Sequence, residues 1–335
     1  MRAASPPRTV ASSRDVRLGL AAAAAAAIIY GIAYPATAIA LRSFTPLAVA
    51  GIACTIALPL VIGLAAVGLL PRPNLTDLRG PRLSRLVVLA ALGGILFIAA
   101  TNVAIALSGS TITGFVAPLY AVAAAVLAVP ILGEHLRWTS IVAFALAIVG
   151  TALLAGVVPD TAALAGVIAA VAAAVLFGLY IVLARRWAVP YRLDGTLVTI
   201  ANLIGRGPVL LLVEGLRPDG TLWPADGVDP AAVLAILVIA IGPSSAANLL
   251  LMASVRRVPA GRTSAALLLT PISSAIVGAV LLSDHLQPIQ LVGAGLILVG
   301  IAVASGIVGG RRGSSGGAAA DQARATERPP GAGSP

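Results

Sequence analysis

The stretch Leu282-Ser283-Asp284-His285-Leu286 matches Leu132-Gly133-Glu134-His135-Leu136, which lies 150 positions earlier. Each stretch ends one long apolar segment and is followed by another. Near the start of each half, residues 25–31 are likewise echoed by residues 172–178. We interpret the chain as an internal duplication of one membrane unit, an architecture common among secondary transporters.

The composition is that of a membrane protein. The chain is 59% hydrophobic and 10% charged, with a mean hydropathy of +1.03, values that exclude an ordinary soluble domain. All 22 basic residues are arginines scattered between apolar runs, so they indicate topology and not nucleic-acid binding. The single cysteine excludes an internal disulfide or a cysteine-rich metal site. Without lysine there is no Gly-rich, Lys-containing nucleotide motif, and we expect no cofactor and no metal.

Ten apolar segments are long enough to cross a bilayer as helices. They are Leu18–Leu41, Leu47–Leu70, Leu86–Leu107, Thr111–Leu132, Trp138–Val157, Ala162–Ala184, Leu197–Val213, Ala231–Val255, Ser264–Leu282 and Ile289–Val308.

The arginines predict the orientation of these spans. Nineteen arginines fall in the termini and in connections that share one side, and the other side holds only Arg42 and Arg217. Arginine is retained on the cytoplasmic side, so both termini are predicted to be cytoplasmic, in the cell inner (plasma) membrane. The loop Glu214–Pro230, with four acids and one arginine, is predicted to lie outside.

An odd number of spans in each half predicts that the halves lie in opposite orientations. The fold predicted is an all-α integral membrane protein, with ten transmembrane helices as two inverted five-helix repeats. Residues 18–158 form the first repeat and residues 159–308 the second. Residues 1–17 and 309–335 are polar and are predicted to be disordered cytoplasmic tails.

These motifs resemble the drug/metabolite transporter superfamily, and within it the ten-helix EamA family. The stretch from Pro271 to Leu286 and the first-half sequence Leu132-Gly133-Glu134-His135-Leu136 carry the resemblance. The chain departs from the family pattern at Ala121, which aligns with a proline, and at Asp284, where the usual residue is glutamate. The resemblance implies transport of small metabolites, often outward.

Arg206 is the foremost candidate for a substrate site. It lies ten residues into a 17-residue apolar run, between Gly205 and Gly207, where a charge costs about 2.5–3.5 kcal/mol on insertion scales. A guanidinium there could hold a carboxylate or phosphate through its bidentate fork. The alternative is a structural role, either snorkelling to an interface or bonding to neighbouring carbonyls.

Four further residues are predicted to line the same site. Asn102 and Asn248 occupy similar positions in the two halves, where a buried amide either joins helices or contacts substrate. Tyr30 and Tyr180 lie within spans of a chain poor in aromatic residues, and a buried phenol usually needs a hydrogen-bond partner. Plain packing is the competing interpretation for both tyrosines.

A second group is assigned to gating or coupling. It consists of acid–histidine pairs at helix ends and prolines within spans: Glu134, His135, Asp284, His285, Pro118 and Pro271. Neighbouring histidine and carboxylate groups suit a proton relay, but an acid that caps the following helix is the stronger interpretation. Proline bends helices that must rock.

The sequence therefore predicts a transporter and not an enzyme. The favoured substrate is a small anionic or zwitterionic metabolite such as an amino acid, and the runner-up is export of drugs or cations. A membrane enzyme or lipid-handling protein with its chemistry in loop Glu214–Pro230 ranks lower, since that loop has no histidine or cysteine. The expected partners are the small-molecule substrate and the lipid bilayer, not nucleic acid, and a homodimer is left open.

Overall fold

The computed structural model describes residues 13–75, 78–133, 138–155, 161–188, 190–191, 193–224, 227–255, 266–267, 269–283 and 287–304. Every regular element in these ranges is helical. The elements are α1 (Ser13–Ala40), α2 (Pro46–Ala66), α3 (Gly80–Leu89), η1 (Ala90–Leu96), α4 (Phe97–Ser108), α5 (Ser110–Val116), η2 (Ala117–Leu119), α6 (Tyr120–Leu132), α7 (Trp138–Ala155), α8 (Thr161–Ala188), α9 (Gly195–Ile204), η3 (Gly205–Val209), α10 (Leu210–Leu216), α11 (Pro230–Ile241), η4 (Gly242–Ala246), α12 (Ala247–Val255), α14 (Leu269–Leu282) and α15 (Pro288–Ala304).

Seven helical runs in the described residues are long and apolar enough to cross a membrane. They are Arg14–Ala40, Pro46–Ala66, Gly80–Ser108, Ser110–Leu132, Thr161–Ala184, Gly195–Leu216 and Pro230–Leu251. Two shorter apolar helices cover residues 269–282 and 288–303. Each of the ten predicted spans overlaps a helix, and the crossing of all ten stays a prediction.

Some helix ends differ from the sequence prediction for local reasons. Helix α1 begins at Ser13, five residues before the predicted start of the first span. Helix α2 ends at Ala66 and not at Leu70, because Gly68 adopts a φ of +81° that a helix cannot continue. Of the tails predicted at residues 1–17 and 309–335, residues 1–12 and 309–335 lie outside the described residues, and residues 13–17 belong to α1.

Four spans are interrupted by short segments that are not α-helical. Element η2 is a 3₁₀ turn that contains Pro118. Elements η3 and η4 are π-helical and contain Pro208 and Pro243. Proline lacks an N–H and clashes with the carbonyl four residues earlier, so the ladder of hydrogen bonds must change there. Element η1 is π-helical at the pair Gly93–Gly94.

Three helices begin at side-chain caps. The Thr45 hydroxyl accepts a hydrogen bond from the Ala48 N–H at the start of α2. Asp194 accepts one from the Leu197 N–H at the start of α9, and Asp229 accepts one from the Ala231 N–H at the start of α11. Each cap satisfies a backbone donor that the helix leaves open.

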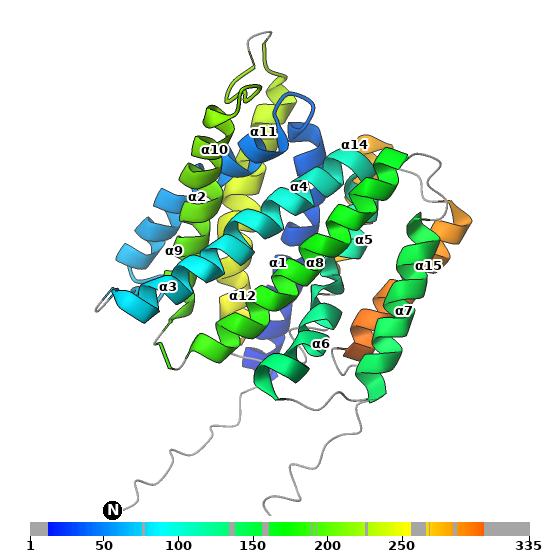
Figure 1. Cartoon of the computed structure of the whole chain (residues 1–335), viewed down its shortest axis with the longest axis horizontal. Helices are drawn as coiled ribbons and strands as arrows, with labels where there is room; N and C mark the ends of the chain where they lie inside the picture. Colours follow the sequence, from blue (N-terminus) through cyan, green and yellow to red (C-terminus); the bar gives the residue numbers. More distant parts are fainter. Residues whose placement is uncertain are drawn as a thin grey trace, which may run out of the picture.

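The helices pack mainly across the two halves of the chain. In Figure 1, α4 and α8 run together across the face in view, and α7 and α15 form one edge. Helix α1 packs against α14, α11 and α12, whereas α8 packs against α6 and α4. Helix α2 packs against α9, η3 and α10. The first helix of each half therefore contacts the third and fourth spans of the other half.

Glycine permits a close approach at two of these crossings. A Cβ on Gly31 of α1 would collide with Ser273 and the Thr270 carbonyl of α14. A Cβ on Gly178 of α8 would lie 2.8 Å from the Ala123 Cβ of α6. Small residues let membrane helices approach backbone to backbone, and here the same kind of contact occurs once for each half.

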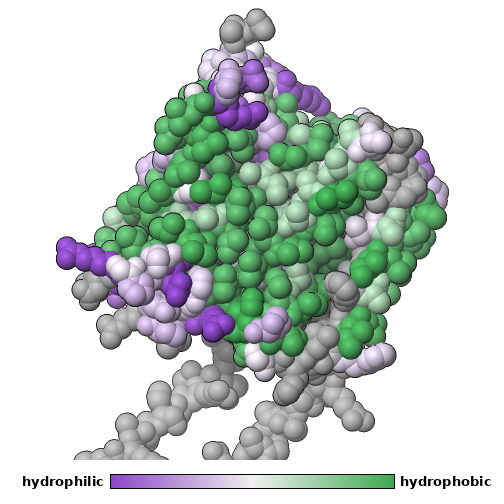
Figure 2. All heavy atoms as spheres, in the orientation of Figure 1, coloured by the Kyte–Doolittle hydropathy of each residue, from purple (hydrophilic) through white to green (hydrophobic). Residues whose placement is uncertain are grey.

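The surface is apolar around the middle of the bundle and polar at its ends. Figure 2 shows hydrophobic residues over most of the face in view and hydrophilic residues gathered at the two ends. Large exposed side chains include Val280 at 75%, Ile168 at 62% and Leu234 at 62% exposure. Such a surface is untenable in water and fits the hydrocarbon core of a bilayer.

We predict that Gly31→Val destabilises the fold by about 1–3 kcal/mol, because the added side chain overpacks the crossing of α1 and α14. Thermal unfolding in detergent, followed by labelling of the single buried cysteine, Cys54, measures the effect. The control is Gly63→Val, since a Cβ on Gly63 meets nothing within 4 Å. Equal unfolding midpoints for the two variants would refute the tight crossing.

Candidate functional site

Arg206 lies in η3, at the middle of the span formed by α9, η3 and α10. Its Nε and Nη2 both donate to the Gly93 carbonyl oxygen, at 3.2 and 2.6 Å. Gly93 belongs to η1, so a charged side chain from one π-helical segment binds the backbone of another. Such segments are frequent at functional sites because they break the regular ladder of hydrogen bonds.

The pair Gly93–Gly94 allows the neighbouring helices to reach this point. A Cβ on Gly93 would lie 2.7 Å from the ring of Tyr180 on α8. A Cβ on Gly94 would lie 3.0 Å from the Asn202 carbonyl oxygen on α9. The ring of Tyr180 therefore packs directly on the backbone segment that binds Arg206.

Asn202 joins the same group from α9, one turn before Arg206. Its Nδ2 donates to the Tyr180 hydroxyl at 3.0 Å. The residue is only 8% exposed, and its Oδ1 has no hydrogen-bond partner within the described part of the chain. Sequence analysis did not select Asn202, although its place one turn from Arg206 in the same span was a usable signal.

An aromatic cluster borders this group. Phe177 stacks on Phe97 with ring centroids 4.3 Å apart and on Tyr180 at 5.1 Å, and it meets the edge of Tyr120 at 5.0 Å. Tyr30 of α1 lies near the same group, within reach of Arg206, Tyr120 and Tyr180. Three predicted site residues, Tyr30, Tyr180 and Arg206, are thus brought together from α1, α8 and η3.

No carboxylate neutralises Arg206 within the described residues, where the ion pair found is Arg217 with Glu214. A hydrogen bond to a charged group contributes about 1.5–3 kcal/mol, against an insertion cost of about 2.5–3.5 kcal/mol for a central arginine. The Gly93 carbonyl offsets much of the insertion cost, and the described residues add no carboxylate to neutralise the positive charge.

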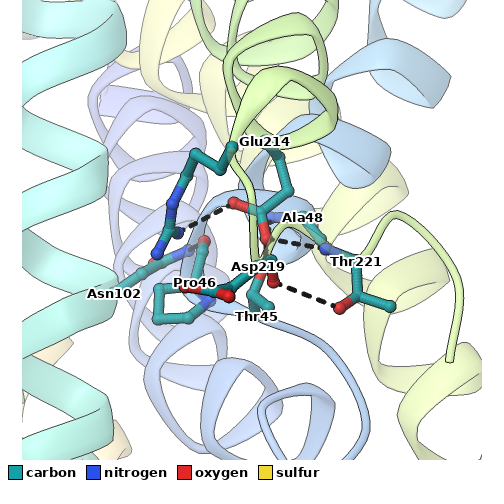
Figure 3. Close-up of polar contacts among 8 residues, drawn as sticks. Thr45, Pro46, Ala48, Asn102, Glu214, Asp219 and Thr221 are labelled. Atoms are coloured by element: carbon teal, nitrogen blue, oxygen red, sulfur yellow. Dashed lines mark hydrogen bonds and ion pairs between the residues drawn. The ribbon is translucent and has the colours of Figure 1, made fainter.

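Asn102 lies in a different place. It is 3% exposed on α4, and its Nδ2 donates to the Pro46 carbonyl oxygen at 2.9 Å. Asn102 is about two and a half helical turns from Gly93 along the chain, and it adjoins the Glu214 group in Figure 3. Here the amide joins α4 to the start of α2. The side chain of Asn248, on α12, lies outside the described residues.

Glu214 is buried, contrary to the sequence prediction. The sequence placed it at the start of an exposed acidic loop, but it lies in the last turn of α10 and is 0% exposed. Its carboxylate accepts hydrogen bonds from the Thr45 hydroxyl at 2.7 Å, Arg217 Nη1 at 3.1 Å and the Thr221 N–H at 3.3 Å (Figure 3). A burial that depends on loop folding leaves no periodic signal in the sequence.

The predicted gating residues are only partly described. Pro118 is buried in η2 and Pro271 is buried near the start of α14. Glu134, His135, Asp284 and His285 lie outside the described residues. Their assignment to gating or coupling stays a prediction.

Apolar helices of membrane length around a central charge define a multi-pass membrane protein, and comparison with known proteins gives its family. The profile of the EamA-like transporter family matches residues 17–156 and again residues 164–306. The chain belongs to this family of membrane transporters, and the two matches confirm the internal duplication.

Two further comparisons were made. A solved structure described as "Crystal structure of protein" is 22% identical to this chain, with a TM-score of 0.61 over 90% of this chain and 99% of that one. At this identity the likeness is one of fold. No curated protein matches the chain.

We predict that Tyr180→Phe lowers stability by about 1–3 kcal/mol, because it leaves the buried Asn202 amide without its partner. The control is Tyr120→Phe, whose hydroxyl makes no hydrogen bond to a described residue although its ring belongs to the same cluster. The measurement is the unfolding midpoint of each purified variant. The bond is unimportant if both substitutions have the same effect.

Proposed function

We propose that this chain is a secondary transporter that exports a small metabolite bearing a carboxylate, an amino acid or a related zwitterion or anion. Arg206 carries this proposal. Its guanidinium lies at the middle of a span, is held by a neutral carbonyl, and has no acidic partner among the described residues. A bound carboxylate would supply the missing negative charge.

The atoms that remain available fit a zwitterion. Arg206 Nη1 makes no hydrogen bond within the described residues, so it can donate to a carboxylate. Asn202 Oδ1 is a buried acceptor without a described partner and can accept from an ammonium group. Tyr180 connects the two residues, because its hydroxyl accepts from Asn202 and its ring packs on Gly93, whose carbonyl binds Arg206.

We infer that the two halves are inverted repeats that work by alternating access. The exchanged packing supports this inference, since α1 contacts α14 as α8 contacts α6. In Figure 1, α1 and α8 also run in opposite directions along the bundle. Inverted halves can present nearly the same pathway to either side of a membrane in turn.

The competing functions have less support. A transporter of hydrophobic cations needs a negative group in its path, whereas the central charge here is positive. Glu214, the buried acid nearest in sequence on the same span, is engaged by three donors. An enzyme in the loop would need a cluster of reactive groups, and the described residues contain no His, Cys, Asp or Glu group suited to a metal ion.

We predict that Arg206→Ala abolishes transport and that Arg206→Lys restores it only partly, because lysine cannot form a bidentate pair with a carboxylate. Comparison of exported and retained metabolites between expressing and deleted cells identifies the solute. Uptake of that solute by proteoliposomes then measures each variant. Arg79→Ala is the control, since this arginine is exposed in the loop before α3.

The Arg206 variants must insert and purify like the wild type for this comparison to hold. Wild-type transport by Arg206→Ala would show that the charge is structural, bound to the Gly93 carbonyl for stability alone. Turnover of a solute by detergent-purified protein without a membrane would instead favour an enzyme.

We predict that reporter fusions after Arg79 and after Asp219 score as cytoplasmic and external respectively. The reason is the retention of arginine-rich connections on the cytoplasmic side. A phosphatase reporter, active only outside, and a fluorescent reporter, active only inside, make the two measurements independent. The opposite pattern would show that the connection at Arg79 lies outside the cell and that the loop at Asp219 lies in the cytoplasm.

A further inference from the structure

The loop after α10 holds the connection between α1 and α2 at three points. The Thr45 hydroxyl donates to Glu214 at 2.7 Å, and the Ser43 hydroxyl accepts from the Asp229 N–H at 3.2 Å. The Phe44 and Trp223 rings meet edge to face, with centroids 5.4 Å apart. We call this set of contacts the Glu214 clasp.

The Glu214 clasp is closed tightly over its carboxylate. Arg217 and the Thr221 N–H bind the same group from the loop side (Figure 3). A Cβ on Gly220 would collide with the Glu214 carbonyl oxygen, so the loop folds directly over the end of α10. The charge of Glu214 is thereby removed from solvent and fully hydrogen-bonded.

A second clasp lies at the opposite end of α2. Asp194 Oδ2 accepts a hydrogen bond from the Asn74 N–H at 3.0 Å, while its Oδ1 caps α9. Leu78, from the same loop as Asn74, packs with Leu193 and Leu197. We call this set of contacts the Asp194 clasp.

The two clasps occupy equivalent places with the halves exchanged. Thr45 caps α2, the second helix of the first half, and Asp194 caps α9, which begins the second span of the second half. Each cap also bonds to the other half, near where its second span ends: Thr45 donates to Glu214 in the last turn of α10, and Asp194 accepts from the N–H of Asn74 in the loop after α2. One capping side chain per half therefore joins the two halves, once at each end of the bundle.

We propose that these two clasps are the alternating closures of the transport pathway, and that each transport step opens one while the other stays closed. The proposal rests on the proposed function, since it assumes alternating access. Each clasp can open reversibly, because water that enters at an open end replaces the hydrogen bonds that are lost. Opening both at once would remove the capping contacts between the halves at both ends of the bundle.

The native cysteine provides the test. Cys54 is the only cysteine in the chain and is buried near the middle of α2, where α2 packs against Gly207 of η3. A membrane-impermeant maleimide, added to sealed right-side-out or inverted vesicles that contain the full-length protein, reports which end has opened. This labelling requires no substrate, so its failure is distinguishable from a failure of the Arg206 site.

Two variants break one clasp each and keep the helix cap. Thr45→Gly retains most of the capping preference but removes the donor to Glu214, whereas Thr45→Ser retains both. Asp194→Ser keeps one capping oxygen and loses the acceptor for Asn74. The control Ser84→Ala removes an exposed hydroxyl that donates to the Pro81 carbonyl oxygen in α3, outside both clasps.

We expect Thr45→Gly to speed Cys54 labelling about tenfold from the Glu214 side only, the shift expected for one lost bond to a charged group. Asp194→Ser should speed it from the other side only, and Thr45→Ser and Ser84→Ala should match the wild type. Unchanged labelling in both test variants, or faster labelling from the same side in both, would overturn the proposal.

Discussion

The structure depends on how an apolar bundle accommodates one guanidinium. In hydrocarbon, a charge and every freed backbone group need partners within the protein. Arg206 finds its partner in the Gly93 carbonyl, and both residues lie in π-helical segments. The irregular backbone is therefore part of the site. The segment that carries the guanidinium, η3, and the segment whose carbonyl binds it, η1, both depart from α-helical geometry where they meet.

Because glycine has no Cβ, the glycine positions determine which helices can approach closely around that charge. Gly93 admits the ring of Tyr180, and Gly207 brings η3 against Cys54 and Thr55 of α2, where a Cβ would lie 2.9 Å from the Thr55 N. Hydrophobic transfer cannot favour one apolar contact over another in lipid, so close packing and polar contacts select the arrangement. The Asn202–Tyr180 bond and the Arg206–Gly93 bonds are the polar part of that selection.

The sequence predicted the apolar helices, seven of which are of membrane length among the described residues, and it singled out Arg206, because apolar length and an isolated charge are local signals. It also selected Tyr30 and Tyr180, which stand out in a chain with few aromatic residues. The sequence could not predict the role of Gly93, because every residue has a backbone carbonyl. Gly93 also lies more than a hundred positions from Arg206. Glu214 escaped notice because its burial depends on the fold of a loop, and its partner Thr45 comes from the other half of the chain.

One span connects the central charge to both ends of the bundle. Asp194 caps its start, Arg206 lies in its π-helical middle, and Glu214 lies in its last turn. A π-helical segment absorbs a change of helix direction more easily than a continuous α-helix does. A substrate that pulls Arg206 away from the Gly93 carbonyl would therefore alter the angle between α9 and α10, and the two clasps lie on the far ends of those helices. The proposed substrate site and the two proposed closures thus lie along a single span.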